Sequence, residues 1–260
     1  MSDAYVKLTK EGPLGIITLD RPPANSYELK FMQDLGKAVD AVAADDEIKV
    51  ALIVSDSEKF FCGGADIKAF LSHTTEENMQ MIEEGHRVLA SIADIPKIFI
   101  AVINGHAMGG GLEIALACDL RFAGDGKFFL ALPEVTLGIL PGNGGTQRLT
   151  RLIGSSKALE MMITGGTVNA QKALELGLVN EVYPQNSLRE DAMAYASKLA
   201  AGPTLAIGEI KRCVHEGVNM SLEDGLKLER DLIAGLFDTA DAHEGISAFA
   251  EKRKAEFQGK

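Results

Sequence analysis

Twice along the chain, a short apolar segment typical of a buried strand leads into a glycine-rich loop and then into a helical segment. The first passage begins at Val50–Val54 and runs through Gly63-Gly64 into a short helix. The second begins at Ile98–Ile103 and runs through residues 104–111 into an apolar helix at Leu112–Cys118. The two passages share little sequence, but they predict two comparable turns of chain, each presenting loop backbone at a helix start.

The other segments place these two turns in a larger pattern of strands followed by helices. Alternating apolar residues around the turn-forming Glu11-Gly12-Pro13 predict an N-terminal hairpin, and helical spacing dominates from about residue 155 onward. This order indicates a layered α/β core with a helical C-terminal extension. The further predicted strands are Tyr5–Leu8, Gly15–Leu19, Leu120–Ala123, Phe128–Leu132 and Val179–Val182. The further predicted helices are Leu29–Val42, Ile67–Leu71, Glu76–Ala93, Ser155–Thr164, Ala170–Leu176, Leu188–Ala200, Thr204–Glu216, Leu222–Phe237 and Ala240–Phe257, with a basic helix around Arg148 and Arg151.

A broad apolar stripe runs along one of the late helices. Such a stripe needs a partner, which is either the core of the same chain or another subunit. Its members are Leu226, Leu228, Leu232, Ile233, Leu236 and Phe237.

The composition is that of an ordinary globular protein. With 46% apolar and 24% charged residues, the chain is too hydrophobic for disorder, and 260 residues can bury a substantial core. No apolar run approaches the roughly 20 residues that span a bilayer. The N-terminal segment lacks the features of a signal or transit peptide. We therefore expect a soluble, cytoplasmic protein that does not enter membranes.

Charge and cysteine content exclude further classes of protein. Cys62, Cys118 and Cys213 are widely spaced and include no CxxC pair, which argues against disulfides and against a zinc site. A formal charge of −11 disfavours binding to nucleic acid. An anionic ligand would have to be held by local cations or by backbone donors.

Gly109-Gly110-Gly111, at the start of the second apolar helix, is the most unusual local feature. Three glycines inside an element cost roughly 0.5–1 kcal/mol each relative to alanine, so something must require bare backbone there. One interpretation is that backbone N–H groups face a ligand oxygen at the positive end of the helix. The other is a tight turn with close helix packing, and the loop alone leaves both open.

Several familiar catalytic and binding motifs are absent. The chain has no GxxxxGK[ST] phosphate loop, no GxGxxG after a strand and no GxSxG elbow. His106 beside the glycine loop is more typical of a structural histidine. Cys62 has no evident histidine partner and is more typical of a buried thiol than of a nucleophile.

Two glutamates stand out because each is the only ionisable residue in an apolar stretch. Glu113 lies in the first turn of the helix after the glycine loop, and Glu134 follows Pro133. Alone, each is explained equally well by a helix start, where an acidic residue or a proline is favoured. Together, beside loops that offer backbone donors, they form the set needed for proton transfer next to a carbonyl. Burial would raise both pKa values toward neutrality, so each could give and take a proton.

The sequence as a whole resembles the crotonase, or enoyl-CoA hydratase/isomerase, superfamily, and is most similar to its enoyl-CoA hydratases. The resemblance covers essentially the whole chain. It rests on several motifs in order: Ile17–Pro22, Phe61–Ile67, Asn104–Glu113, Pro133-Glu134, Pro141–Leu149 and Glu244–Arg253.

This resemblance implies an enzyme that adds water across the 2,3 double bond of an enoyl-CoA. The N–H groups of Ala65 and Gly110 would form an oxyanion hole for the thioester oxygen. Glu113 would deprotonate the water that attacks C3, and Glu134 would protonate C2. Gly142 would supply a backbone donor near the reacting water. No metal or cofactor is expected, because coenzyme A is part of the substrate.

The resemblance also implies a fold and an assembly. The fold would be a spiral of ββα turns, with a core over residues 1–198 and a helical oligomerisation region over residues 199–260 that forms a homotrimer, often paired into a hexamer. The coenzyme A moiety would be bound by Lys59, Ala65, Asp66, Ile67 and Lys68. The cluster Lys252–Lys254 could assist from the same or a neighbouring subunit.

The sequence departs from the family pattern at two places that bear on the acyl pocket. Leu130-Ala131-Leu132 replaces Phe-Gly-Gln before Pro133-Glu134, with an interval between Glu113 and Glu134 one residue longer, and Cys62 stands where alanine or serine is more usual. The alternatives within the fold are Δ3,Δ2-enoyl-CoA isomerisation, which needs one carboxylate, and thioester hydrolysis. A third is RNA binding, which the acidic charge disfavours.

Overall fold

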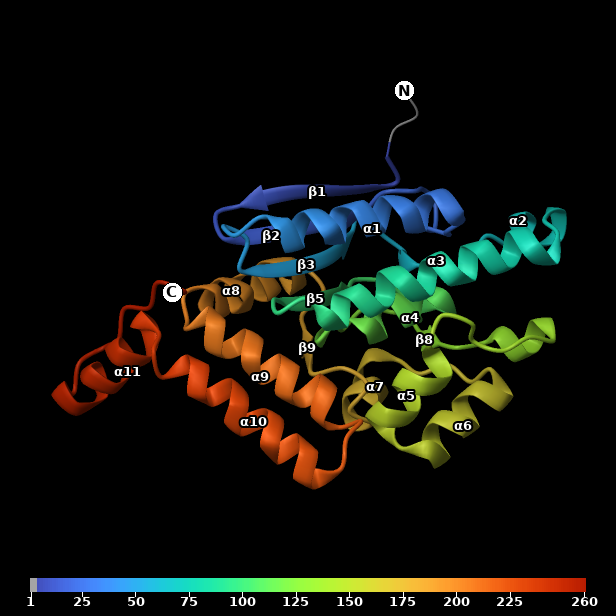
Figure 1. Ribbon diagram of the computed structural model, residues 1–260. Helices are drawn as coiled ribbons and strands as arrows, with labels where there is room; N and C mark the ends of the chain where they lie inside the picture. The colour runs from blue at the N-terminus through green and yellow to red at the C-terminus, as the bar shows by residue number, and fades with distance from the viewer. Residues whose placement is uncertain (1–3) are drawn as a thin grey trace.

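The computed structural model describes residues 4–260, whose strands form two sheets (Figure 1). The larger sheet has six strands, of which only β1 and β2 are antiparallel neighbours; the smaller sheet has three parallel strands. In spatial order the larger sheet contains β1 (Val6–Glu11), β2 (Leu14–Leu19), β3 (Val50–Ser55), β5 (Ile98–Ile103), β7 (Leu120–Gly124) and β9 (Glu181–Tyr183). The smaller sheet contains β4 (Phe60–Cys62), β6 (His106–Met108) and β8 (Leu130–Ala131).

Successive turns of chain add one strand to each sheet and then a helix. β3 is followed by β4 and by helices α2 (Ile67–Ser72) and α3 (Thr75–Asp94); β5 is followed by β6 and α4 (Gly110–Ala117). β7 is followed by β8, the 3₁₀ helix η1 (Glu134–Leu137) and α5 (Gly145–Ile153). The predicted spiral of ββα turns is confirmed. Strands β4 and β6 had been predicted as loop, because three residues are too few to show an alternating pattern.

The larger sheet is covered by helices on both faces. Ile17 and Ile53 belong to the cluster that packs against α1 (Leu29–Ala44), α3 and α4, whereas Ile16 and Leu52 pack against α8 (Leu188–Ala200). Parallel strands buried on both faces read as continuous Val, Ile and Leu runs, and β2 and β3 have this composition.

Helices α9 (Thr204–Gly217), α10 (Leu222–Leu236) and α11 (Ala240–Glu251) lie on one side of the molecule, with α6 (Ser155–Thr164) and α7 (Ala170–Glu175) below the sheets (Figure 1). The prediction of a final helix through Phe257 was wrong. α11 ends at Glu251 because Lys252 adopts a left-handed conformation with φ of 57°. The tail then folds back, and the N–H groups of Gln258 and Gly259 donate to the carboxylate of Asp241.

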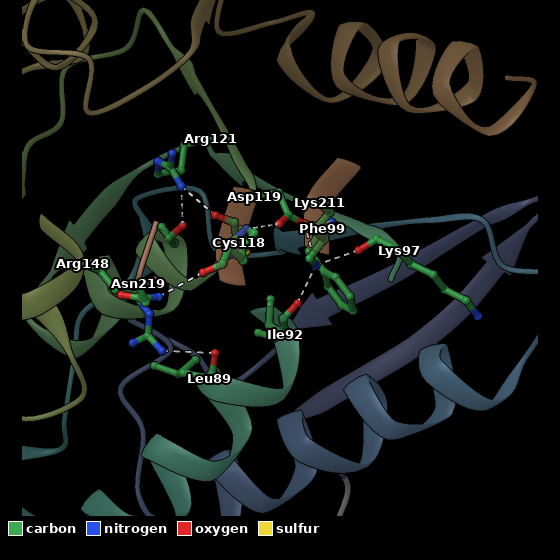
Figure 2. A network of polar contacts seen from close by, with 12 residues as sticks. Leu89, Ile92, Lys97, Phe99, Cys118, Asp119, Arg121, Arg148, Lys211 and Asn219 are labelled. Atoms are coloured by element: carbon green, nitrogen blue, oxygen red, sulfur yellow. Dashed lines mark hydrogen bonds and ion pairs between the residues drawn. The ribbon is translucent and has the colours of Figure 1, made fainter. Parts of the chain in front are cut away.

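A buried lysine fastens α9 to the core, as Figure 2 shows. The ammonium group of Lys211 donates to the carbonyl oxygens of Ile92 at 2.7 Å and Lys97 at 2.9 Å, and to the carboxylate of Asp119 at 3.0 Å. Both charged side chains are more than nine-tenths buried. Since an unpaired buried charge is costly, this ion pair ties the position of α9 to the end of α3 and the start of β5.

The apolar stripe of α10 is divided between two environments. Part of it packs against α9, whereas Leu226, Ile233 and Phe237 stay between 43% and 58% exposed. Leu222 on α10 and Phe249 on α11 are at least 80% exposed. Among the described residues, no helix combines the length and apolar character needed to cross a bilayer. The division at residue 198 stays a prediction, and it falls within α8.

Candidate active site

The two glycine-containing loops predicted from the sequence meet at the centre of the molecule. Gly64, with φ of 88°, lies so close to the second loop that a Cβ would be 2.7 Å from the Met108 carbonyl oxygen and 3.5 Å from the Gly110 nitrogen. A Cβ on Gly111 would overlap the carbonyl of Cys62, at the end of β4. Close packing between the first loop and the start of α4 therefore explains part of the glycine run.

Two backbone N–H groups remain unused where these loops meet. Tyr27 brackets Ala65, because its N–H donates to Gly64 and its carbonyl accepts from Asp66, both through backbone atoms. In the part of the chain that the structure describes, no hydrogen bond uses the N–H of Ala65 or of Gly110. Both residues line the same cavity. Two unused backbone donors are therefore present on one cavity.

Glu113 lies on α4 with its carboxylate held by the next loop. Its Oε1 accepts hydrogen bonds of 2.7 Å from the N–H groups of Asn143 and of Gly145, and the side chain is 1% exposed. Burial raises the pKa of the Glu113 carboxyl, while the two N–H donors and the charge of Arg148 oppose that rise. The two N–H donors hold the Glu113 carboxyl in a fixed position beside the cavity.

Glu134, at the start of η1, lacks among the described residues the pair of neighbouring N–H donors that holds Glu113. A Cβ on Gly109 would be 2.8 Å from its Oε1, so the carboxyl lies directly against the glycine loop. Its Oε2 is buried and accepts no hydrogen bond from any described residue. Burial, reinforced by the charge of Glu113, raises the pKa of Glu134 to about 7. The predicted helix opening at Pro133 is a single 3₁₀ turn.

The cavity between these groups has a volume of about 190 Å³ and joins a second one of about 630 Å³ between α2, α3 and the segment after η1. The polar side chains on the first cavity are Tyr27, Glu113, Glu134 and Thr136. An apolar cavity with a few convergent polar groups is typical of a small-molecule site. The apolar wall that the two cavities share is formed by Ile67, Phe70, Ile82, Leu137, Ile139 and Leu140.

The other predicted site residues are distributed around this cavity. Gly142 lines it; its carbonyl accepts from His86 at 2.8 Å, and no described residue accepts from its N–H. Ile67 also lines it, whereas Lys59 and Lys68 are exposed outside it. The Asp66 carboxylate caps α2 by accepting from the Lys68 N–H and pairs with Arg21 at 3.1 Å. The structure thus brings the carboxylates and the backbone donors together, and leaves the two lysines at the surface.

Three further predictions concern side chains near the site. His106 stacks between Phe60 and Phe129 and accepts from the Phe129 N–H, which is a structural role. Cys62 is buried behind the cavity wall, where it donates to the Asn25 carbonyl and burial raises its pKa to about 12. Residues 130–132 are buried too, so neither departure from the family pattern lies on the wall of the cavity.

The basic cluster at the C-terminus is already occupied in part. The guanidinium of Arg253 forms ion pairs with Glu244 at 2.6 Å and with Glu251 at 2.7 Å. Hydrogen bonds from Arg253 lower the pKa of Glu244 to about 2. Arg253 therefore stabilises the turn after α11 rather than presenting a free cation.

Two residues of the site had no signal in the sequence. The side chain of Asn143 donates to the hydroxyl of Tyr27 at 2.7 Å, and its carbonyl accepts from Arg148 at 2.9 Å. Asn143 is fully buried and Tyr27 is 2% exposed. Asn143 stood only in a permissive glycine loop, and Tyr27 in no motif, so their contact appears only in the folded chain.

Comparison with known proteins gives consistent results over the full length of the chain. A family model described as enoyl-CoA hydratase/isomerase matches residues 9–260. The 2,3-dehydroadipyl-CoA hydratase of Escherichia coli K12 is 38% identical, covering 94% of this chain and 95% of that protein. The mitochondrial enoyl-CoA hydratase of Pongo abelii is 37% identical, covering 97% of this chain and 86% of that protein. The crystal structure of an enoyl-CoA hydratase from Geobacillus kaustophilus HTA426 superposes with a TM-score of 0.97 at 45% identity, covering 100% of this chain and 98% of that one.

Proposed function

The chain belongs to the enoyl-CoA hydratase/isomerase family, and we propose that it catalyses the reversible addition of water to the 2,3 double bond of a trans-2-enoyl-CoA. The observation that carries this proposal is the joint position of Glu113 and Glu134 on one cavity, beside the unused N–H groups of Ala65 and Gly110. Hydration needs a base, an acid and donors that stabilise an enolate. The two carboxyl groups and the two unused N–H groups on this cavity support such a mechanism.

The proposed reaction moves one proton to the enzyme and one from it. Glu113 takes a proton from water as the water oxygen bonds to C3, and the electrons of the double bond move to the thioester oxygen. The N–H groups of Ala65 and Gly110 stabilise this enolate, each contributing roughly 10²–10³ in rate by analogy with other oxyanion holes. Glu134 then protonates C2. Dehydration follows the same steps in reverse, and coenzyme A participates only as part of the substrate.

The difference between the two carboxyl groups supports this division of roles. Glu113, held by two N–H donors, is suited to remain a base, whereas Glu134, with a pKa of about 7, is suited to carry the proton. A Δ3,Δ2-isomerase would need only one of them. The position of Gly142, with an unused N–H on the same cavity, supports its proposed role as a donor to the reacting water.

The direct test is the identity of the product. Purified protein is incubated with a short trans-2-enoyl-CoA in heavy-oxygen water, and the product is analysed by mass spectrometry. We expect a 3-hydroxyacyl-CoA that carries one heavy oxygen on C3. Free coenzyme A would indicate thioester hydrolysis, and a shifted double bond without added oxygen would indicate isomerisation; either as the main product would contradict the proposal.

We propose that the nucleotide end of coenzyme A lies near Lys59 and Lys68, while Ala65, Asp66 and Ile67 contact it closer to the thioester. The support is the position of both exposed ammonium groups beside the first glycine loop of a chain whose formal charge is −11. Lys68→Ala should raise the KM for enoyl-CoA several-fold but leave the KM for the enoyl-pantetheine thioester unchanged, because pantetheine lacks the nucleotide phosphates. Equal effects on both substrates would place the phosphates elsewhere.

We further propose that copies of the chain assemble through α9–α11 into a homotrimer or a hexamer. Exposed apolar side chains support this, since Leu222, Val218 and Phe249 are each at least 70% exposed. Light scattering after size-exclusion chromatography should give the mass of three or six chains. Leu222→Glu combined with Phe249→Glu should reduce that mass, and a monomeric wild-type protein would contradict the proposal.

A further inference from the structure

Tyr27 is a buried tyrosine on the wall of the cavity. The ring is 2% exposed and packs against Phe31, with ring centroids 6.3 Å apart. A Cβ on Gly110 would overlap the Tyr27 hydroxyl, so this oxygen sits directly against the start of α4. Tyr27 also lines the cavity together with Glu113 and Glu134. The side chain therefore lies on the wall of the proposed site, with its hydroxyl beside one of the two proposed oxyanion donors.

The hydrogen bonds around Tyr27 leave its proton available. Its oxygen accepts from the side-chain amide of Asn143 at 2.7 Å, and no described residue accepts a hydrogen bond from it. A phenolic hydroxyl can accept and donate at once, so the Tyr27 hydroxyl retains one donor that no described residue uses. Burial raises the pKa of Tyr27 well above its usual value, with the charge of Glu113 adding to the rise. The group is therefore a proton-bearing donor throughout the neutral pH range.

Asn143 forms hydrogen bonds with both the Tyr27 hydroxyl and Glu113. The backbone N–H of Asn143 donates to Glu113 Oε1 at 2.7 Å, while its side chain donates to Tyr27. Arg148 in turn donates to the Asn143 carbonyl at 2.9 Å. One buried residue thus contacts both the proposed base and the hydroxyl with the spare donor.

Resting on the function proposed above, we propose that the Tyr27 hydroxyl donates a hydrogen bond to the oxygen that Glu113 activates: the water before addition and the 3-hydroxyl of the product afterwards. The thioester oxygen already has the N–H groups of Ala65 and Gly110 as its donors. A water that donates to Glu113 and accepts from one donor, either Tyr27 or the Gly142 N–H, retains one lone pair that can be aimed at C3, whereas the 3-hydroxyl of the product can accept from both. Tyr27 transfers no proton and orients the nucleophile by direct contact.

The test compares two ligands that differ only in the 3-hydroxyl. 2,2-Difluoro-3-hydroxybutyryl-CoA has no C2 hydrogen to lose and cannot be dehydrated, and 2,2-difluorobutyryl-CoA lacks the hydroxyl. Affinities for both, with each enantiomer of the hydroxy compound, are measured by calorimetry. We expect the wild type to prefer one hydroxy enantiomer over the plain acyl-CoA. Tyr27→Phe should reduce that preference about five- to tenfold, as expected for one hydrogen bond, while its affinity for the plain acyl-CoA is unchanged.

Two other variants keep the test independent of folding defects. Tyr195→Phe removes a hydroxyl on α8 from a residue that does not line the cavity, and should leave both affinities unchanged. Asn143→Ala retains the N–H to Glu113 and frees the Tyr27 hydroxyl, so it should lose part of the same preference. The inference is overturned if the wild type shows no preference for a hydroxy ligand. It is also overturned if Tyr27→Phe lowers the affinity for both ligands equally, or changes neither affinity.

Turnover distinguishes a failure of this inference from a failure of the proposed function. If the wild type hydrates trans-2-enoyl-CoA, Tyr27→Phe should lower kcat about five- to tenfold, as expected for one hydrogen bond, with little change in KM, and Tyr195→Phe should not. If the wild type does not hydrate it, the proposed function fails. The ligand pair then still reports whether Tyr27 contacts an oxygen on C3.

Discussion

Glu113 and Glu134 line one cavity in contrasting environments. Two backbone N–H groups hold Glu113 Oε1 at 2.7 Å, whereas Glu134 Oε2 is buried without a hydrogen-bond partner among the described residues. Burial raises the pKa of both carboxyl groups, and at Glu113 two N–H donors and the charge of Arg148 oppose that rise. The proposed division of roles requires that the resting pair hold one proton, on Glu134.

This relationship predicts a bell-shaped pH dependence of kcat/KM. The active enzyme carries one proton on the pair, and that proton is lost as the pH rises past about 7, the pKa of Glu134. Because hydration consumes no net proton, kcat/KM for dehydration must follow the same profile as hydration. Initial rates in both directions, measured across pH with a short enoyl-CoA and its hydrated product, test this. A rate that stays flat well above neutral pH would contradict the assignment.

The raised pKa of Glu134 also predicts a cost in stability. The pKa of its carboxyl is 4.5, the ordinary value, in the unfolded chain and about 7 in the folded chain, so the folded state binds the proton more tightly between these values. The free energy of unfolding therefore falls as the pH rises through this range. Glu134→Gln should match the wild type near pH 4.5 and exceed it by about 1–2 kcal/mol above pH 8, after allowance for partial exposure.

Urea unfolding of both proteins at these two pH values measures the effect. Glu160→Gln, on the exposed face of α6, serves as the control and should show no such pH-dependent difference. Equal stability of Glu134→Gln and the wild type at the higher pH would show that Glu134 is not destabilised by burial.

The close contact between Gly111 and the Cys62 carbonyl predicts that alanine is tolerated much less well at Gly111 than at the open position Gly217. Gly111→Ala should lower the free energy of unfolding by about 1–3 kcal/mol or more, because its Cβ would meet the backbone carbonyl of Cys62, which cannot move aside. Gly217→Ala, at the end of α9, has nothing within 4 Å of the new Cβ and should be neutral or slightly stabilising. Denaturant unfolding compares the two, and similar effects would contradict the packing described.

The buried ion pair of Figure 2 predicts a strong dependence of stability on Lys211. Lys211→Met should cost about 3–5 kcal/mol, because it leaves the buried carboxylate of Asp119 without its ammonium partner. Adding Asp119→Asn should restore part of the loss. Lys157→Met breaks an exposed pair with Glu160 and should change stability little. A small effect of Lys211→Met in chemical denaturation would show that α9 is fastened by other contacts.

Much of the fold could be predicted from local patterns. Apolar runs such as Ile98–Ile103 identified the buried strands, and helical spacing identified the long helices, because burial on one face or two imposes a period on the sequence. The three-residue strands β4 and β6 are too short for any period to appear. The end of α11 was also missed, since it depends on the backbone of a single residue, Lys252.

Only those residues of the site that belong to a local sequence motif could be predicted. Glu113, Glu134 and the glycine loops stand out as exceptions to their surroundings, and the structure places them on one cavity. Tyr27 and Asn143 are separated by 116 positions, and their hydrogen bond joins segments that no periodic pattern relates. Contacts of this kind follow from the packing of whole turns, not from local residue choice.

The most direct test of the account is the hydration rate of Glu113→Gln, beside that of Glu134→Gln, with a short trans-2-enoyl-CoA followed by loss of the enoyl-thioester absorbance. Glutamine retains the size of each side chain but can neither take nor give the proton. We predict that each variant loses about 10²–10⁴ in kcat, as general acid–base groups typically contribute. Full hydration activity in Glu113→Gln would contradict the two-carboxylate mechanism.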